Sequence, residues 1–285
     1  MILLKRIVNK KFLTSFITLG LIFFPVDSSV IPAQASEITE DEYQQQLNNE
    51  ALMSILWVQT SAEYRALCYQ AYNTAMAQID KAVKKHKKKD KPLAIVLDID
   101  DTILDTSIYD ESFIDTSKRP TLENMKTWIN SAAASPMPGA VDFLQNVSKK
   151  GIKIFYVTNR RASEHSQGTI KNLKKFGFPS ADSEHILLRT DSGNKQERFD
   201  RIAKDFKIIV YLGDNAGDFP LDTYGKLIEE RKEIFDKHKN DFGTKFIVLP
   251  NPIYGSWEFA IDKNYNKMSQ EEKKAARRAA LRKWK

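Results

Sequence analysis

The sequence predicts an α/β fold: a Rossmann-like parallel β-sheet with helices on both faces, together with an additional, mainly helical part. Five short runs rich in β-branched and aromatic residues have the composition of strands, and helical patterns lie between most of them. The runs are apolar along almost their whole length, which is typical of parallel strands buried on both faces. They span residues 94–100, 153–159, 185–189, 208–214 and 245–250.

The first 35 residues have the layout of a secretory signal peptide. Basic residues precede an apolar stretch at residues 12–26, and residues 33–35 read Ala-Gln-Ala, a small-x-small cleavage site. The apolar stretch is short for a membrane-spanning helix and is interrupted by Pro25. We therefore expect cleavage after Ala35, and no stable membrane anchor in the mature chain.

The rest of the chain divides into three predicted parts. Residues 36–92 form an N-terminal helical segment that packs on the core, residues 93–268 form the α/β domain, and residues 269–285 form a basic helical tail. We expect the tail to lie on the surface without a further role. Within the α/β domain, apolar residues at three-and-four spacing predict helices at residues 140–149, 164–176, 195–206 and 224–239.

Charge and cysteine content narrow the class of protein. The net charge of +7 falls to about +4 once residues 1–35 are removed, so the mature chain is mildly basic. The lysine-rich stretch at residues 81–91 has no interleaved Phe, Tyr or Trp, which favours a solvated surface over binding to a nucleic-acid polymer. Because Cys68 is the only cysteine, no internal disulfide forms and stability depends on the apolar core.

Acidic residues gather where the predicted strands end. Asp98 and Asp100 follow the first strand, and Asp214 and Asp218 follow the fourth. In parallel sheets the ligand lies beyond the carboxyl ends of the strands, so these carboxylates are expected to converge. They cannot all stay ionised unless a cation neutralises them or some take up protons. With no His or Cys nearby, we expect Mg²⁺ held by Asp98, the backbone carbonyl of Asp100, and Asp214, with Asp218 as a further candidate ligand.

These acids also have two simpler interpretations. A calcium loop that starts at Asp98 needs Gly and Glu where Ile103 and Tyr109 stand, so the EF-hand pattern fails. Asp100 and Asp101 can also be ordinary turn and helix-cap residues, but that interpretation does not explain the second acidic motif at residues 214–218.

The pattern of residues suits phosphoryl transfer. Asp98 is the candidate nucleophile, which forms an aspartyl-phosphate, and Asp100 is the candidate acid and base. Lys195, at the start of a predicted helix, supplies positive charge beside them. Thr158 and the amide of Asn159, at the end of the second strand, are placed to hold a phosphate oxygen. The sequence lacks the Cys- and His-based phosphatase motifs and a Walker-type phosphate loop.

Four elements occur in order: DxDxT after a first strand, Thr after a second, Lys at a helix start and GDxxxD after a later strand. This set resembles the haloacid dehalogenase (HAD) superfamily of phosphotransferases. More narrowly, LDIDDTILDTSIY, FYVTNR and YLGDNAGDF resemble the signatures of the class C, non-specific acid phosphatases, which are secreted or lipid-anchored bacterial enzymes. The segments WVQTSAEYRALCYQAYNTA and LPNPIYGSWE are similar to that family too, so the resemblance spans nearly the whole mature chain.

The resemblance implies a HAD-like catalytic domain at residues 93–268 and a Mg²⁺-dependent phosphomonoesterase that is most active in acid. Small-molecule phosphate monoesters, including nucleoside 5'-monophosphates, are the implied substrates. Aromatic side chains over the site would then hold the base by stacking. Tyr254 and Trp257 are the first candidates; Tyr109 and Trp57 are weaker ones, and for Trp57 core packing is the favoured interpretation.

The sequence departs from the usual family pattern at three positions: Asp101 where Glu is general, Thr106 where Asn is frequent, and Ala216 where Leu is common. None of these is a proposed catalytic residue, so we expect them to affect the shape of the site rather than its mechanism. The missing lipid-anchor cysteine indicates a freely secreted bacterial protein, extracellular or associated with the cell wall.

Two other functions stay open. A HAD-type sugar-phosphate phosphatase or mutase would carry the same motifs. An exported binding protein or adhesin without turnover would have no need of them, and the intact Asp98, Asp100, Lys195 and Asp214 argue against it. The oligomeric state is not predicted by the sequence.

Overall fold

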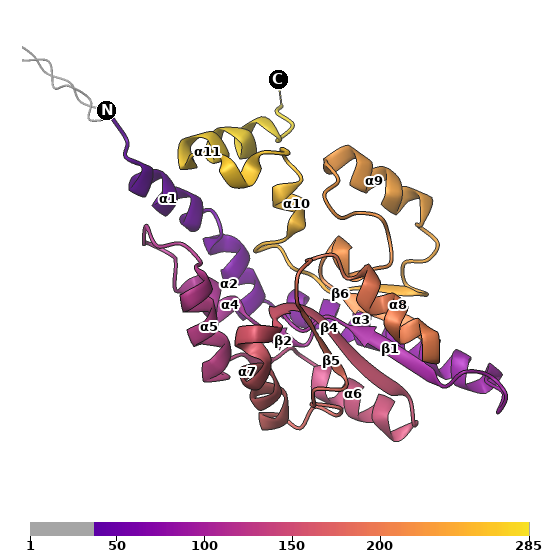
Figure 1. Ribbon diagram of the computed structural model, residues 1–285. Coiled ribbons are helices and arrows are strands. Elements are labelled where there is room, and N and C mark those ends of the chain that lie inside the picture. Colours follow the sequence, from indigo (N-terminus) through magenta and orange to yellow (C-terminus); the bar gives the residue numbers. More distant parts are fainter. Residues whose placement is uncertain (1–36, 285) are drawn as a thin grey trace, which may run out of the picture. The chain divides into compact units, whose positions relative to one another are not determined.

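A five-stranded parallel sheet organises the protein, as seen in a computed structural model that describes residues 37–284 (Figure 1). The predicted signal peptide and its cleavage site lie outside these residues. The strand order is β5-β4-β1-β6-β7. The strands are β1 (Leu93–Leu97), β4 (Lys153–Arg161), β5 (Ile186–Arg189), β6 (Lys207–Gly213) and β7 (Phe246–Val248). Each coincides with one of the five predicted runs, so the predicted fold class is confirmed.

The strands are buried on both faces because alternate side chains enter two separate apolar cores. In β1, Leu93, Ile95 and Leu97 belong to the first core, whereas Ala94 and Val96 belong to the second. The neighbouring strands β4 and β6 divide their side chains in the same way. This arrangement explains why the strand sequences show almost no alternation of apolar and polar residues.

Helices cover both faces of the sheet. The first core is closed by α3 (Ala62–Lys85), which contacts β6 and β7, and by α6 (Ala140–Lys149), which contacts β4. Leu173 of α7 (Ala162–Lys175) joins the same core. On the other face, Phe199 and Ile202 of α8 (Gln196–Asp205) pack into the second core. Capping supports these helices locally, since the Ser61 hydroxyl accepts a hydrogen bond from the amide of Tyr64 at the start of α3.

A segment inserted after β1 lies beside the carboxyl end of the sheet. It contains β2 (Leu104–Asp105), α4 (Ser107–Glu111), α5 (Leu122–Ser131) and β3 (Ser135–Pro136), with β2 and β3 paired antiparallel. Helix α5 packs closely on α7 at Gly168, where a Cβ atom would lie 2.6 Å from the carbonyl oxygen of Ile129. A glycine is therefore required there for the two helices to approach.

The first and last helices of the described residues pack together. Helix α1 (Glu40–Asn49), which is followed by α2 (Leu52–Thr60), contacts the C-terminal helix α11 (Gln270–Ala279). Arg277 of α11 pairs with Glu50 at 2.7 Å and with Glu258 at 2.6 Å. The expectation that the basic tail has no role beyond lying on the surface is wrong, because Arg277 ties it to two other parts of the fold.

The predicted helices differ from the observed ones mainly at their starts. Helix α6 has the predicted bounds, and α8 differs by one residue at each end. Helix α9 (Ile228–Lys237) begins four residues later than predicted, because residues 224–227 form the turn before it. The remaining short helices are η1 (Ala216–Asp218), α10 (Ser256–Phe259) and η2 (Tyr265–Lys267).

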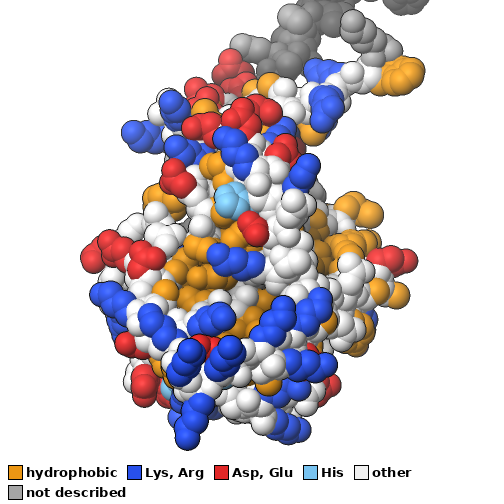
Figure 2. Space-filling model, turned by 90° about the vertical axis from the view of Figure 1, so that its right-hand side faces the viewer, with side chains coloured by type: hydrophobic (Ala, Val, Ile, Leu, Met, Phe, Trp, Pro, Cys, Tyr) orange, Lys and Arg blue, Asp and Glu red, His pale blue; other side chains and the backbone are white. Residues whose placement is uncertain are grey.

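Charge is unevenly spread on the surface. Figure 2 shows Lys and Arg side chains gathered over the lower part of one face, with Asp and Glu side chains mainly in its upper part. Within the predicted solvated stretch at residues 81–91, all the lysines are exposed. Among the helices of residues 37–284, none combines the length and apolar character needed to span a bilayer.

Candidate active site

The acidic motifs meet at the topological switch point of the sheet. From β1 the chain continues to β4 and β5 on one side, and later adds β6 and β7 on the other, so the order reverses between β1 and β6. Leu97 pairs with Leu212 at the ends of these two strands, and the amide of Asp98 donates to the carbonyl of Leu212 at 3.0 Å. This pairing brings the loops that follow the two strands together.

Three of the four predicted carboxylates form one cluster. Asp98, Asp214 and Asp218 each place a carboxylate oxygen within 4.8 Å of those of the other two. Thr102 donates to Oδ1 of Asp214 at 2.9 Å, and Asn251 donates to its Oδ2 at 2.9 Å, so this side chain is fixed from two sides. The expectation that residues more than a hundred positions apart converge is therefore confirmed for these three acids.

Lys195 is the cationic partner of the cluster. Its Nζ lies 2.7 Å from Oδ1 of Asp98 and 2.7 Å from Oδ1 of Asp218, and the residue is only 3% exposed. It sits at the N-cap position of α8, as the sequence predicted. Burial lowers the pKa of Lys195, but Asp218 and Asp98 outweigh this effect and raise it, so the amine stays protonated.

The position of Asp218 depends on Gly213. A Cβ atom on Gly213 would lie 2.2 Å from Cβ of Asp218, a distance that no side chain could tolerate. The 3₁₀ turn η1 folds the chain back, so that Oδ2 of Asp218 accepts a hydrogen bond from the amide of Asn215 at 2.8 Å. The other oxygen of Asp218 accepts a hydrogen bond from Lys195, so both oxygens have donors. Asp218 therefore helps to position the lysine.

The cluster carries more negative charge than Lys195 neutralises. Burial raises the pKa of Asp98 to about 7, with Lys195 opposing the shift and Asp218 adding to it. Burial, Asp218 and Asp98 also raise the pKa of Asp214 well above its usual value. Three crowded carboxylates that share only one paired lysine among the described residues are hard oxygen donors, and they fit a hard divalent cation.

The fourth predicted carboxylate, Asp100, is held apart from the cluster. Its two oxygens accept hydrogen bonds from Arg160, with Nη2 to Oδ1 at 2.6 Å, Nε to Oδ1 at 3.1 Å and Nε to Oδ2 at 3.0 Å. The sequence predicted that Asp100 would contribute its backbone carbonyl to a metal site. The contact of its side chain with Arg160 leaves that carbonyl available. As a side-chain ligand, Asp100 is not part of the cluster.

The end of β4 supplies the predicted phosphate-binding residues. Thr158 is buried, and its hydroxyl accepts the amide of Arg160 at 3.2 Å. Arg198 of α8 donates to the carbonyl of Thr158 at 2.6 Å and to Oδ1 of Asn159 at 2.8 Å. Arg198 therefore fixes this strand end against the helix that carries Lys195.

Two of the positions that depart from the family pattern contact each other. Asp101 accepts the Thr106 amide at 3.2 Å and the Thr106 hydroxyl at 2.7 Å. Burial raises the pKa of Asp101 to about 6, against the opposing hydroxyls of Thr106 and Tyr254. The pair stabilises the turn after β1, which agrees with the expectation that these departures affect the shape of the site.

The segment 249–258 is tied to the second acidic motif. Besides the bond from Asn251 to Asp214, the hydroxyl of Ser256 donates to Oδ1 of Asn215. Trp257 is 46% exposed, and its indole lies so close to Gly255 that a Cβ there would be 2.6 Å from Cδ1. Tyr254 is half-buried, with its hydroxyl toward Asp101. The structure thus brings both aromatic candidates to the loops of the acid cluster.

The two weaker aromatic candidates serve in packing. Tyr109 stacks on Trp128 with ring centroids 5.8 Å apart, and its hydroxyl donates to Asn124 at 2.7 Å. Trp57 meets Tyr64 edge to face at 5.5 Å and packs against the first core, as favoured from the sequence. These contacts give Tyr109 a packing role as well; whether it also binds substrate stays a prediction.

Sequence reasoning missed Arg160, Arg198 and Asn251 as parts of the site. A signal existed for two of them. Arg160 is the last residue of FYVTNR, two positions after Thr158, and Arg198 lies three positions after Lys195 on the same helix. Asn251 follows the fifth strand by three residues and lies in the family-like segment LPNPIYGSWE, but it carries no charge that would mark it as a partner of Asp214.

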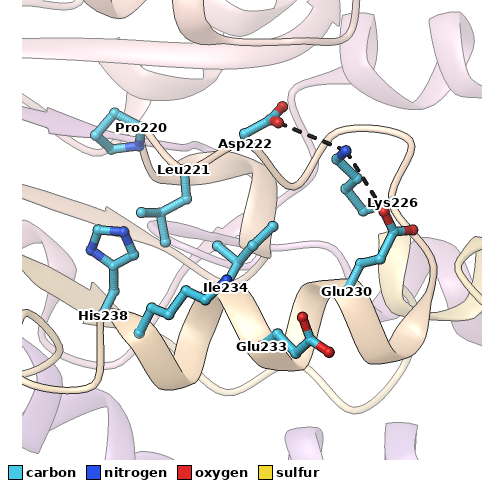
Figure 3. Close-up of a pocket in the computed structure, with 9 residues that line it drawn as sticks. Pro220, Leu221, Asp222, Lys226, Glu230, Glu233, Ile234 and His238 are labelled. Atoms are coloured by element: carbon cyan, nitrogen blue, oxygen red, sulfur yellow. Dashed lines mark ion pairs between the residues drawn. The ribbon is translucent and has the colours of Figure 1, made fainter.

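A surface hollow of about 380 Å³ lies between the loop after η1 and helix α9 (Figure 3). Lys226 reaches toward Asp222 and Glu230 there, at 3.8 Å and 3.7 Å. None of the predicted site residues lines this hollow. It is therefore separate from the acid cluster.

Comparisons with known proteins agree with this geometry. The family model described as "HAD superfamily, subfamily IIIB (Acid phosphatase)" matches residues 24–257. A structure of the class C acid phosphatase from Bacillus anthracis matches with 38% identity and a TM-score of 0.80, covering 84% of this chain and 100% of that chain. A second structure of that enzyme, with tungstate bound, matches with 37% identity and a TM-score of 0.79 over the same shares of each chain.

The family match and the structural matches confirm the resemblance seen in the sequence motifs, and the enzyme class with it. The chain therefore belongs to subfamily IIIB of the HAD superfamily, is a class C acid phosphatase, and acts as a phosphomonoesterase.

Proposed function

We propose that this phosphomonoesterase is a secreted, Mg²⁺-dependent enzyme that hydrolyses nucleoside 5'-monophosphates, among other phosphate monoesters, through an aspartyl-phosphate on Asp98. The observation that carries the proposal is the pairing of Asp98 with Lys195 at 2.7 Å inside a cluster of three carboxylates. A carboxylate that faces a fixed cation is suited to attack an anionic phosphate. The related enzyme has been crystallised with tungstate bound, and tungstate is a tetrahedral oxyanion like phosphate, which supports phosphate as the group that this protein binds.

In the proposed first step, a carboxylate oxygen of Asp98 attacks phosphorus while the bond to the ester oxygen breaks. The departing oxygen keeps the electron pair and takes a proton from the Asp100 carboxyl. Lys195 holds Asp98 in place and offsets the charge that builds up on the phosphoryl group. Thr158 and the amide of Asn159 contribute hydrogen bonds to a phosphoryl oxygen.

In the second step, water attacks phosphorus of the aspartyl-phosphate, and the bond to the Asp98 oxygen breaks. Asp100, now a carboxylate, takes the proton of the attacking water, so the enzyme returns to its starting state. Asp98, Asp214, Asp218 and the backbone carbonyl of Asp100 are the groups that would hold Mg²⁺. When bound, the ion supplies positive charge that reduces repulsion between these carboxylates and the phosphoryl group.

The test is a phosphate-release screen of the mature protein against nucleotides, sugar phosphates and phosphopeptides, before and after removal of metal by EDTA. We expect the highest kcat/KM with nucleoside 5'-monophosphates, loss of activity after chelation, and recovery with Mg²⁺. Asp98→Asn serves as the control and should be inactive. Full activity after exhaustive chelation would remove the metal from the mechanism, and a preference for sugar phosphates would contradict the nucleotide assignment.

Base stacking is tested by a matched pair of exposed aromatic residues on α10. Trp257 and Phe259 are 46% and 50% exposed, but only Trp257 borders the loop of the acid cluster. We expect Trp257→Leu to raise KM for nucleoside monophosphates by about 5- to 100-fold, the value of one stacked base, while KM for phenyl phosphate changes little. Phe259→Leu should change neither; equal effects of both substitutions would rule out a base clamp at Trp257.

Secretion is supported by the layout of residues 1–35 in the sequence. We expect the exported protein to begin at residue 36. Intact-mass measurement of protein from the culture medium and from the cell envelope tests this, and an exported chain that retains residues 1–35 would contradict it.

A further inference from the structure

Arg160 is one of the most enclosed charged groups in the described part of the chain. It is 3% exposed, and its guanidinium lies between the carboxylate of Asp100 and the hydroxyl of Thr169. Nη1 donates to Thr169 at 3.1 Å, and Thr169 in turn donates to the carbonyl of His165 at 2.8 Å. Arg160 is therefore anchored on α7 and presents its remaining N–H groups to Asp100.

The contact between Arg160 and Asp100 is stronger and more directional than an ordinary ion pair. A planar guanidinium that bonds both oxygens of a carboxylate fixes its orientation as well as its position. Asp100 is partly exposed, with a side-chain exposure of 25% against 2% for Arg160. Its carboxylate is thus partly open to solvent, while Arg160 holds it from the buried side.

The same contact separates Asp100 from the other acids. Asp98, Asp214 and Asp218 share a cluster with Lys195, whereas Asp100 has its own cation. Asp100 lies only two residues from Asp98, so without Arg160 nothing among the described contacts would keep its side chain away from the cluster. Its acid–base role needs a carboxyl group that is free of the cluster and aimed at the leaving oxygen.

We propose that Arg160 is the positioning residue of the acid–base group Asp100, an inference that rests on the proposed function above. As the proton passes from Asp100 to the leaving oxygen, negative charge develops on the Asp100 carboxylate, and Arg160 stabilises that charge at a fixed place. Arg160 itself keeps its proton throughout and exchanges none with the substrate. When the aspartyl-phosphate is hydrolysed, the same contact holds Asp100 in position to accept the proton of water.

The test compares substrates whose leaving groups differ in their need for a proton. Dinitrophenolate leaves without one, whereas the alkoxide of an alkyl phosphate does not. For Arg160→Met we expect kcat/KM with ethyl phosphate to fall by about 10²- to 10⁴-fold, the usual contribution of a positioned acid. With dinitrophenyl phosphate the loss in kcat/KM should stay below about 10-fold. This parameter is chosen because it reports only the steps up to formation of the aspartyl-phosphate, in which the leaving group departs. An equal loss with both substrates would overturn the proposal, because a structural role would produce that result.

Arg198 provides the matched control. It is also a partly buried arginine at this end of the sheet, but it contacts Thr158 and Asn159 rather than Asp100. Arg198→Met should therefore weaken activity to a similar degree with every leaving group. If Arg160→Met does not fold, Arg160→Lys decides: it keeps the charge but loses the two-point contact, and should show a smaller loss with the same dependence on the leaving group.

A double variant separates this inference from the proposed function. If Arg160 acts through Asp100, the substitution Arg160→Met should cost nothing further in kcat when Asp100→Asn is already present. Additive losses would overturn the inference alone. Activity of Asp100→Asn that is equal to wild type on ethyl phosphate would instead overturn the acid–base role on which it rests.

Discussion

Two acidic groups at one edge of the sheet have different partners and different environments. In the cluster of Asp98, Asp214 and Asp218, Lys195 pairs with two of the three acids and is the one cation in ion-pair contact among the described residues, so the carboxylates crowd one another. Asp100, only two residues from Asp98, has Arg160 to itself. The aspartates of the cluster thus have more negative charge than their cation balances, whereas Asp100 forms a balanced ion pair with Arg160.

The difference teaches that local backbone geometry assigns roles within a DxD motif. In a continuous strand, side chains two residues apart point to the same face. Strand β1 ends at Leu97, however, and the chain bends at Ile99, between the two acids. Asp98 therefore faces α8 and Lys195, whereas Asp100 faces the end of β4 and Arg160.

Substitution of Lys195 should have the largest effect on the acid cluster. In Lys195→Met, Asp98 and Asp218 would face each other without their shared cation. We expect the free energy of unfolding to fall by about 3–5 kcal/mol, as for other broken buried ion pairs, and kcat to fall by at least about 10²-fold. Urea unfolding and steady-state kinetics, both without added metal and with Mg²⁺, measure the two effects.

Lys226→Met is the matched control, since Lys226 lies in exposed ion pairs with Asp222 and Glu230. It should change the free energy of unfolding by less than about 1 kcal/mol and leave kcat unchanged. Equal destabilisation by the two substitutions would mean that burial of the Lys195 pairs is not what makes them important.

The addition of one methyl group at Gly213 should disturb the cluster less. Gly213→Ala would push Asp218 away from its place beside Lys195, because the new Cβ would lie 2.2 Å from that of Asp218. We expect a loss of about 1–3 kcal/mol in stability and a clear loss of kcat. Gly217→Ala, in the same loop, meets no atom within 4 Å and should change stability by no more than about 0.5 kcal/mol. Wild-type activity in Gly213→Ala would show that Asp218 is not needed where the structure places it.

The smallest expected effect is a change in the stability of the acid cluster with pH. Burial raises the pKa of Asp98 from 3.8 to about 7. The native state therefore binds more protons than the unfolded state between these values, and stability without metal should fall as the pH rises through this window. Mg²⁺ competes with those protons. Its stabilising effect should be small near about pH 5 and reach about 5–10 °C in Tm near about pH 8 at saturating Mg²⁺.

Differential scanning fluorimetry with and without Mg²⁺ across this range checks the prediction. A Tm increase that is as large in acid as near neutral pH would contradict a cation site made of carboxylates with raised pKa values.

The sequence predicted the sheet and the convergence of the acids because both depend on regular features. Apolar strands such as β1 are recognisable locally, and the switch-point rule places Asp98 beside Asp214 without knowledge of side-chain contacts. The partition of the carboxylates could not be predicted, because it depends on Arg160 and on the bend at Ile99. The role of Arg277 was missed for a similar reason: its partners, Glu50 and Glu258, are known only from the tertiary structure.

We propose that the side chains of Asp98, Asp214 and Asp218 hold the divalent cation and that the side chain of Asp100 does not. Calorimetric titration of Mg²⁺ into wild type, Asp214→Asn and Asp100→Asn tests it most directly. We expect Asp214→Asn to abolish or severely weaken binding, and Asp100→Asn to retain an affinity close to wild type, because only its backbone carbonyl is available to the ion. Loss of binding in Asp100→Asn to the same degree as in Asp214→Asn would contradict the division of the acidic residues into two groups.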